Sequence, residues 1–195
     1  MSIAKRRPES DLPRTIAEFD VWNAGQPERW EFIGGCPMMM APASKPHTII
    51  KTNIARHLAN RLAGARCRTY AEGVEIKTAA MSLIPDVAVE CGPIDLTTPS
   101  VAEPVLIVEV LSPSTAKDDI GQKWQGYCLI QSLRHYLVVA QDSRFVTLHT
   151  RTGPASFEET VHQEGVIELA ALGVSLSFEE IYEDVTFPDL AAADG

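Results

Sequence analysis

The sequence lacks any apolar run as long as a membrane helix, and its first residues, Met1 to Pro13, are polar and charged, unlike a secretory signal. We therefore expect a cytoplasmic protein with no membrane contact. Internal repeats and low-complexity segments are also absent. The cysteines are widely scattered with no C-x-x-C pair, which argues against a zinc site or a disulfide framework and predicts reduced, packed thiols. They are Cys36, Cys67, Cys91 and Cys128.

Composition indicates one globular domain with a real core, because 45% of the 195 residues are hydrophobic and 22% are charged. We predict a flexible leader over residues 1–13, a domain over 14–188 and a frayed tail over 189–195. The net charge of -9 argues against non-specific binding of nucleic acid. Its distribution is uneven, however: ten of the acids follow Arg151, whereas seven bases lie between Lys45 and Lys77. Such a basic zone is more often a solvated helix face than a DNA groove.

Hydrophobic periodicity and turn residues predict helices and strands that alternate along the chain. Capping boxes at Thr15-x-x-Glu18 and Ser177-x-x-Glu180 indicate two short helices, over 15–23 and near the C-terminus. This order predicts an α/β or α+β layered fold with a sheet between helices. The other expected helices cover 46–63 and from after Thr115 to about 131; the expected strands cover 30–33, 37–41, 67–78, 83–91, 105–111, 136–140, 145–150 and short stretches near 157 and 166.

One acidic residue, Glu109, interrupts the aliphatic stretch from Val105 to Leu111, which is typical of a strand buried on both faces. A buried carboxylate costs several kcal/mol unless a cation compensates it. Two explanations remain open at this point. Glu109 either points at a metal ion, or it has a structural partner or a solvent-exposed face.

Two more ionisable residues come from segments next to the Glu109 strand. Asp86 begins the preceding apolar strand, and Lys123 lies at the edge of the apolar face of the following helix. Two carboxylates at neighbouring strand ends can hold Mg²⁺, and a nearby lysine can orient or deprotonate a water and offset negative charge on an attacked phosphoryl group. Taken singly, Asp86 could cap a turn, Lys123 could reach solvent and Glu31 could be an exposed hairpin residue. Taken together, they favour hydrolysis of phosphodiester bonds.

Several motifs of the chain occur in the order typical of the Uma-two family, which the sequence resembles over roughly residues 15–185. Its members are described as "putative restriction endonucleases" with the PD-(D/E)xK nuclease fold. The resemblance implies a mixed sheet flanked by helices in a single domain, with Asp86 and Glu109 as ligands of Mg²⁺ or Mn²⁺. It also implies that Glu31 and Lys123 complete the catalytic set. The motifs are Trp30-Glu-Phe-Ile-Gly-Gly35, Ala41-Pro-Ala-Ser44 followed by His47, Ile84-Pro-Asp-Val-Ala-Val89, Ile107-Val-Glu-Val-Leu-Ser-Pro-Ser-Thr115, Asp119-Ile-Gly-Gln-Lys123, Tyr127 and His135-Tyr-Leu-Val-Val139.

The chain departs from the family at the hairpin turn, where Gly34-Gly35-Cys36 replaces Asp-Gly-Glu, and it keeps Leu111 where the wider superfamily has the lysine. We predict a metal-dependent endonuclease that acts on nucleic acid, with DNA favoured, and that forms a homodimer. Substrate contacts are predicted for His47, Lys117 and Tyr127. The alternative is a nuclease-derived binding or assembly module that no longer cuts, whose acidic C-terminal segment meets a protein partner.

Overall fold

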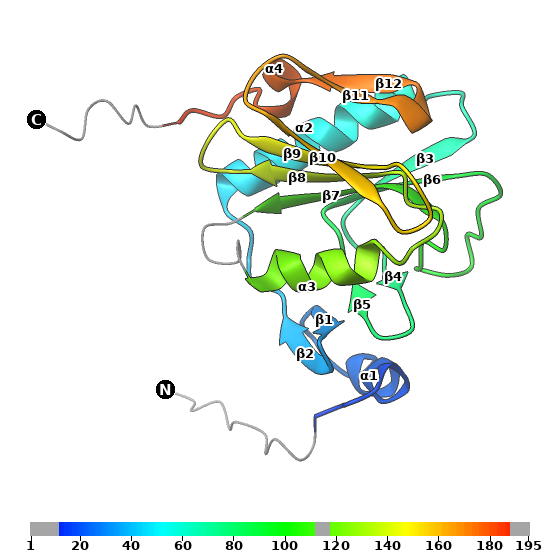
Figure 1. Ribbon diagram of the computed structural model, residues 1–195. Coiled ribbons are helices and arrows are strands. Elements are labelled where there is room, and N and C mark those ends of the chain that lie inside the picture. Colours follow the sequence, from blue (N-terminus) through cyan, green and yellow to red (C-terminus); the bar gives the residue numbers. More distant parts are fainter. Residues whose placement is uncertain (1–11, 112–117, 188–195) are drawn as a thin grey trace, which may run out of the picture.

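Aliphatic runs in the middle of the chain form a six-stranded mixed sheet in the computed structural model, which describes residues 12–111 and 118–187. The strand order is β10-β9-β8-β7-β6-β3, with β7 and β8 parallel and the other neighbours antiparallel. β7, which carries Glu109, lies inside the sheet between β6 and β8 and is largely buried, as predicted. The strands are β3 (Cys67–Ala71), β6 (Val87–Cys91), β7 (Pro104–Leu111), β8 (His135–Ala140), β9 (Val146–Arg151) and β10 (Phe157–His162) (Figure 1).

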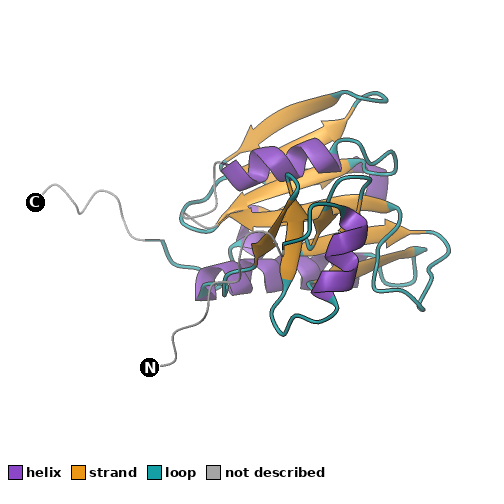
Figure 2. Cartoon of the chain, turned by 90° about the horizontal axis from the view of Figure 1, so that it is seen from below, coloured by secondary structure: helices purple, strands orange, loops and turns teal. Residues whose placement is uncertain are grey.

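Helices cover both faces of this sheet, so the predicted single α/β domain is confirmed (Figures 1 and 2). On one face, α2 (Lys45–Arg61) buries Ile50, Ile54 and Leu58 against Leu106 and Val108 of β7. These helix residues recur every four positions and therefore form one apolar stripe. On the other face lies α3 (Asp118–Tyr127), which ends four residues earlier than the expected end at about 131.

A smaller four-stranded sheet packs on the α3 side of the domain and shares its core. The predicted hairpin forms its edge, and α1 (Ile16–Asn23) covers it with Phe19 5.2 Å from the ring of Phe32. The capping box of Thr15 and Glu18 is present at the start of α1. In the order β2-β1-β5-β4, the strands are β2 (Cys36–Met39), β1 (Trp30–Ile33), β5 (Ser82–Leu83) and β4 (Ile76–Lys77).

The predicted continuous strands over 67–78 and 83–91 are wrong, because each is divided between the two sheets. Glu72 and Gly73 have φ angles of 65° and 86°, left-handed values that end β3 before β4 begins. Pro85, which has no backbone N–H to donate, separates β5 from β6 in the same way. Because of these two breaks, residues of the smaller sheet and of the larger sheet lie side by side at one rim of the domain.

The C-terminal part adds a two-stranded sheet and a short helix on the α2 side. The predicted capping box of Ser177 and Glu180 is present at α4 (Phe178–Ile181). The strand-like stretch near 166 is β11 (Val166–Leu169); its partner β12 (Val174–Ser177) was not expected, and a 3-10 helix, η2 (Ala170–Leu172), connects them. The predicted leader 1–13 and tail 189–195 lie almost wholly outside the described residues.

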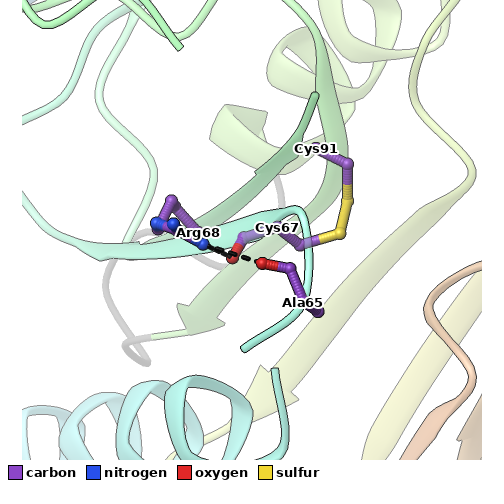
Figure 3. The surroundings of a disulfide bond; sticks show 4 residues. All are labelled: Ala65, Cys67, Arg68 and Cys91. Carbon is purple, nitrogen blue, oxygen red and sulfur yellow. Dashed lines mark hydrogen bonds between the residues drawn. A yellow bond between two sulfur atoms is a disulfide. The ribbon is translucent and has the colours of Figure 1, made fainter. Parts of the chain in front are cut away.

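The prediction that all cysteines are reduced is wrong for two of them. Cys67 of β3 and Cys91 of β6 are direct partners in the antiparallel ladder and form a disulfide (Figure 3). Beside it, Arg68 donates hydrogen bonds to the carbonyls of Ala65 and Cys67. A separation of 24 residues gives no hint of the pairing, which depends on the register of the two strands. Cys36 and Cys128 are free thiols.

The basic zone predicted between Lys45 and Lys77 is largely paired within the protein. Arg56 pairs with Glu183, and Arg61 with Glu180, so α2 binds part of the acidic C-terminal segment. These arginines therefore do not form an open DNA-binding face. Within residues 12–111 and 118–187, no helix has the length and apolar character needed to cross a membrane.

Candidate active site

The register of β6 and β7 places Asp86 beside Glu109. Val87 faces Val108 in the antiparallel ladder, and Asp86 and Glu109 come one position further along each strand. Residues directly opposite each other in such a ladder point to the same face of the sheet. Both carboxylates line one cavity of about 640 Å³ at this rim.

Asp86 is held by groups from two elements. The backbone N–H of Val110 donates to Asp86 Oδ2 at 2.8 Å, and His47 Nε2 lies 3.2 Å from the same oxygen. His47 stands in the first turn of α2, which Ser44 caps by accepting the His47 backbone N–H. Its Nδ1 is buried and has no hydrogen-bond partner among the described residues. The carboxylate is thus fixed toward the cavity.

Glu109 is a buried carboxyl group with two donors on one oxygen. The Tyr127 hydroxyl donates to Glu109 Oε1 at 2.8 Å, and Lys123 Nζ lies 3.4 Å from that atom. Burial raises the pKa of Glu109 to about 8; the Lys123 ammonium opposes the shift, whereas the Asp86 and Glu31 charges add to it. In the absence of a further cation, burial therefore favours the protonated form of this carboxyl group.

Lys123 points inward from α3 and joins the two sheets at the site. Its Nζ lies 3.0 Å from Glu31 Oε2, and its side chain is only 9% exposed. Glu31 comes from β1, and its other oxygen accepts the backbone N–H of Ile84 at 2.8 Å. The structure therefore brings together all four residues predicted as the catalytic set: Glu31 from β1, Asp86 from the bend before β6, Glu109 from β7 and Lys123 from α3.

The three predicted substrate contacts have different outcomes. His47 lines the cavity beside Asp86. Tyr127 is fully buried, and its hydroxyl donates to Glu109, so its contact with substrate stays a prediction. Lys117 lies outside the described residues.

Sequence analysis missed several residues that line the cavity. Arg29, Lys51 and Glu72 supply two cations and a fourth carboxylate, and Met38 and Met39 supply an exposed apolar wall from β2. A hydrogen bond from Ser44 to Gln141 closes the rim. Lys51 and Glu72 both lie in the basic zone between Lys45 and Lys77, but no local motif indicates a role for either residue.

The donor set suits a hard divalent cation. Asp86 and Glu109 offer carboxylate oxygens to the same cavity, and Mg²⁺ is commonly held by one or two carboxylates with waters completing its shell. Over the part of the chain that the structure describes, no group of three or more His, Cys, Asp or Glu side chains is placed to hold a metal ion. An ion held by the two carboxylates would therefore take its other ligands from water.

Helices cover a mixed sheet that has carboxylates and a lysine at its rim, which defines a mixed α/β protein with a charged cavity. The chain belongs to the Uma2 family, described as "Putative restriction endonuclease", whose sequence model matches residues 16–179. An uncharacterized protein of Synechocystis sp., slr1290, is 29% identical over 92% of this chain and 97% of its own length. A crystal structure of a "putative nuclease belonging to DUF820" from Anabaena variabilis has a TM-score of 0.71 at 17% identity, covering 87% of this chain and 97% of that one.

Proposed function

We propose that this protein is a Mg²⁺- or Mn²⁺-dependent nuclease that hydrolyses phosphodiester bonds, with DNA as the favoured substrate. The observation that carries the proposal is the convergence of Asp86, Glu109 and Lys123 in one cavity. The restriction-endonuclease description of the family supports both the reaction and the substrate.

Asp86 and Glu109 would hold the ion. Their positions are set by the backbone N–H of Val110 and by the Tyr127 hydroxyl, respectively, so neither carboxylate needs to reorganise. Bound there, the ion would supply Lewis acidity, polarising the phosphodiester and neutralising its developing charge. We assign His47 to orienting Asp86, because its Nε2 faces that carboxylate.

Lys123 would act on the attacking water. Glu31 holds the amine at 3.0 Å, which keeps it beside Glu109 and inside the cavity. From there, Nζ can donate a hydrogen bond to the water and stabilise charge on the phosphoryl oxygens. Water adds to phosphorus, the bond to the leaving oxygen breaks, and the products are a phosphate monoester and a free hydroxyl.

The test is a cleavage screen with single- and double-stranded DNA and RNA in Mg²⁺ or Mn²⁺. Asp86→Asn and Lys123→Ala should each abolish hydrolysis. Glu179→Gln and Lys77→Ala are matched controls, because neither Glu179 nor Lys77 lines the cavity, and they should cut like the parent. Site variants that cut as fast as the parent would refute the assignment.

The second candidate function is a binding module that does not cut. The net charge of -9 and the glycine turn in place of Asp-Gly-Glu favour this function. The pairing of Glu180 and Glu183 with α2 removes part of that acidic surface. Calorimetry discriminates the two: binding of Mn²⁺ or Mg²⁺ that is lost in Glu109→Gln supports the nuclease. The homodimer is also a proposal, and light scattering on the purified protein tests it.

A further inference from the structure

A second cluster of charged side chains, Arg29, Lys51 and Glu72, lines the same cavity. Glu72 accepts a hydrogen bond from Arg29 Nη1 on Oε1 at 2.5 Å and from Lys51 Nζ on Oε2 at 2.7 Å. Lys51 is buried on α2 with only 9% of its side chain exposed, whereas the Glu72 and Arg29 side chains are about half exposed. Two cations from different elements thus hold one two-oxygen anion that faces solvent.

The backbone fixes this anion next to the candidate catalytic acid. Glu72 has a φ of 65°, a left-handed value that is strained for a residue with a side chain. Its N–H donates to the carbonyl of Asp86 at 3.0 Å. Non-glycine residues in such conformations are found disproportionately at functional sites. The cluster of Arg29, Lys51 and Glu72 is therefore attached directly to the segment that presents Asp86.

We propose that Arg29 and Lys51 form a binding subsite for a backbone phosphate of the nucleic acid, and that Glu72 occupies this subsite in the free protein. The inference rests on the proposed function, which it deepens by naming the contact that holds the strand beside the scissile bond. On binding, a phosphodiester replaces the carboxylate, since both groups present two anionic oxygens. The half-exposed Glu72 side chain swings outward to solvent.

The charge of the cavity explains why a displaceable carboxylate is useful. Its lining carries the cations Arg29, Lys51 and Lys123 against the acids Glu31, Glu72, Asp86 and Glu109. While Glu72 pairs with Arg29 and Lys51, its charge offsets those two cations toward a polyanion that approaches the cavity. Moving Glu72 out frees two cations, each with several remaining N–H donors for phosphate oxygens. Arg29 is placed to grip two oxygens at once, because its guanidinium is a planar fork.

The experiment measures binding of fluorescein-labelled single- and double-stranded DNA by anisotropy, with Ca²⁺ in place of Mg²⁺ and over a range of salt concentrations. Arg29→Gln should weaken binding about 3–10-fold near 0.1 M salt and reduce the slope of log K against log salt by about 0.7–0.9, the loss of one phosphate contact. Glu72→Gln, which removes only the competing charge, should bind more tightly than the parent. Arg144→Gln is the matched control: Arg144 is also partly exposed and paired with a glutamate, but it lies outside the cavity.

Each outcome decides the matter. If Arg29→Gln loses no more affinity than Arg144→Gln, or if Glu72→Gln binds more weakly than the parent, the subsite is wrong. A parent that binds neither DNA also overturns it. Cleavage by the parent is scored separately with Mg²⁺, so that binding through Arg29 without cleavage would refute the nuclease and keep the subsite. Thermal unfolding of each variant shows whether it is folded. The test substitutes Arg29 because its side chain is about half exposed, whereas a substitution of the buried Lys51 could unfold the protein.

Discussion

Replacing Glu109 by glutamine should make the metal-free protein more stable while abolishing its proposed activity. The glutamine keeps an oxygen that accepts the Tyr127 hydroxyl, and it removes a carboxyl group whose ionisation is opposed by burial. A shift of the pKa from 4.5 to about 8 corresponds to an upper limit of about 5 kcal/mol, at 1.36 kcal/mol per pKa unit. Because the substitution also removes one ionic partner of Lys123, we expect a smaller gain of about 1–3 kcal/mol at alkaline pH.

The sign of the pH dependence follows from proton linkage. The folded parent binds a proton at Glu109 more tightly than the unfolded chain does, so its free energy of unfolding falls as pH rises from the unfolded pKa of 4.5 through about 8. The glutamine variant has no such loss. The difference between the two proteins should therefore be small near pH 4.5 and largest above pH 8.

The assay is urea denaturation in EDTA, followed by circular dichroism at several pH values. Asp142→Asn, an exposed acid outside the cavity, is the control for a general loss of negative charge. Two results would refute the account of Glu109 as an uncompensated buried acid. In the first, Glu109→Gln is less stable than the parent at pH 8.5; in the second, it is more stable by the same amount at every pH.

Three further perturbations test how the site is supported. Tyr127→Phe removes a hydrogen bond that lowers the pKa of Glu109, so the acid limb of the pH–rate profile should move to higher pH, with cleavage about tenfold slower; an unchanged profile contradicts this. Arg151 donates to carbonyls that include the Cys128 and Leu133 oxygens after α3, so Arg151→Met should lower stability by about 2–4 kcal/mol in urea melts, and a loss below about 1 kcal/mol would count against it. Reduction of the bond between Cys67 and Cys91 should cost about 2–4 kcal/mol, and a double serine variant of the two cysteines should match the reduced protein and be indifferent to dithiothreitol.

Features that depend on local chemistry were accessible from the sequence. The helix starts at Thr15 and Ser177 are determined by a side chain and a glutamate three residues away, and both are present as predicted. The burial of β7 follows from its own aliphatic composition. Glu109 stood out for the same reason, since it was the one polar residue in that strand.

Features that depend on register or on long-range packing were not accessible. The strand expected over 67–78 contains enough β-branched and aromatic residues to continue, but the left-handed backbone at Glu72 divides it between two sheets. The disulfide from Cys67 to Cys91 follows from the register of β3 and β6, and the pairing of Lys51 with Glu72 follows from the packing of α2 beside the end of β3. Nothing within a few residues of Lys51 indicates that a carboxylate 21 positions away will face it.

The buried position of Glu109 connects the stability of the fold with the proposed chemistry. A carboxyl group with a pKa of about 8 is a poor ligand at neutral pH until a divalent cation replaces its proton. If Asp86 and Glu109 hold the ion as proposed, binding must release about one proton near pH 7, and the affinity must rise with pH up to about 8. Calorimetry in two buffers of different ionisation enthalpy measures that proton. Metal binding without proton release would mean one of two things: Glu109 is already ionised in the free protein, which removes the basis of the stability argument, or Glu109 does not bind the ion, which removes its assignment as a ligand.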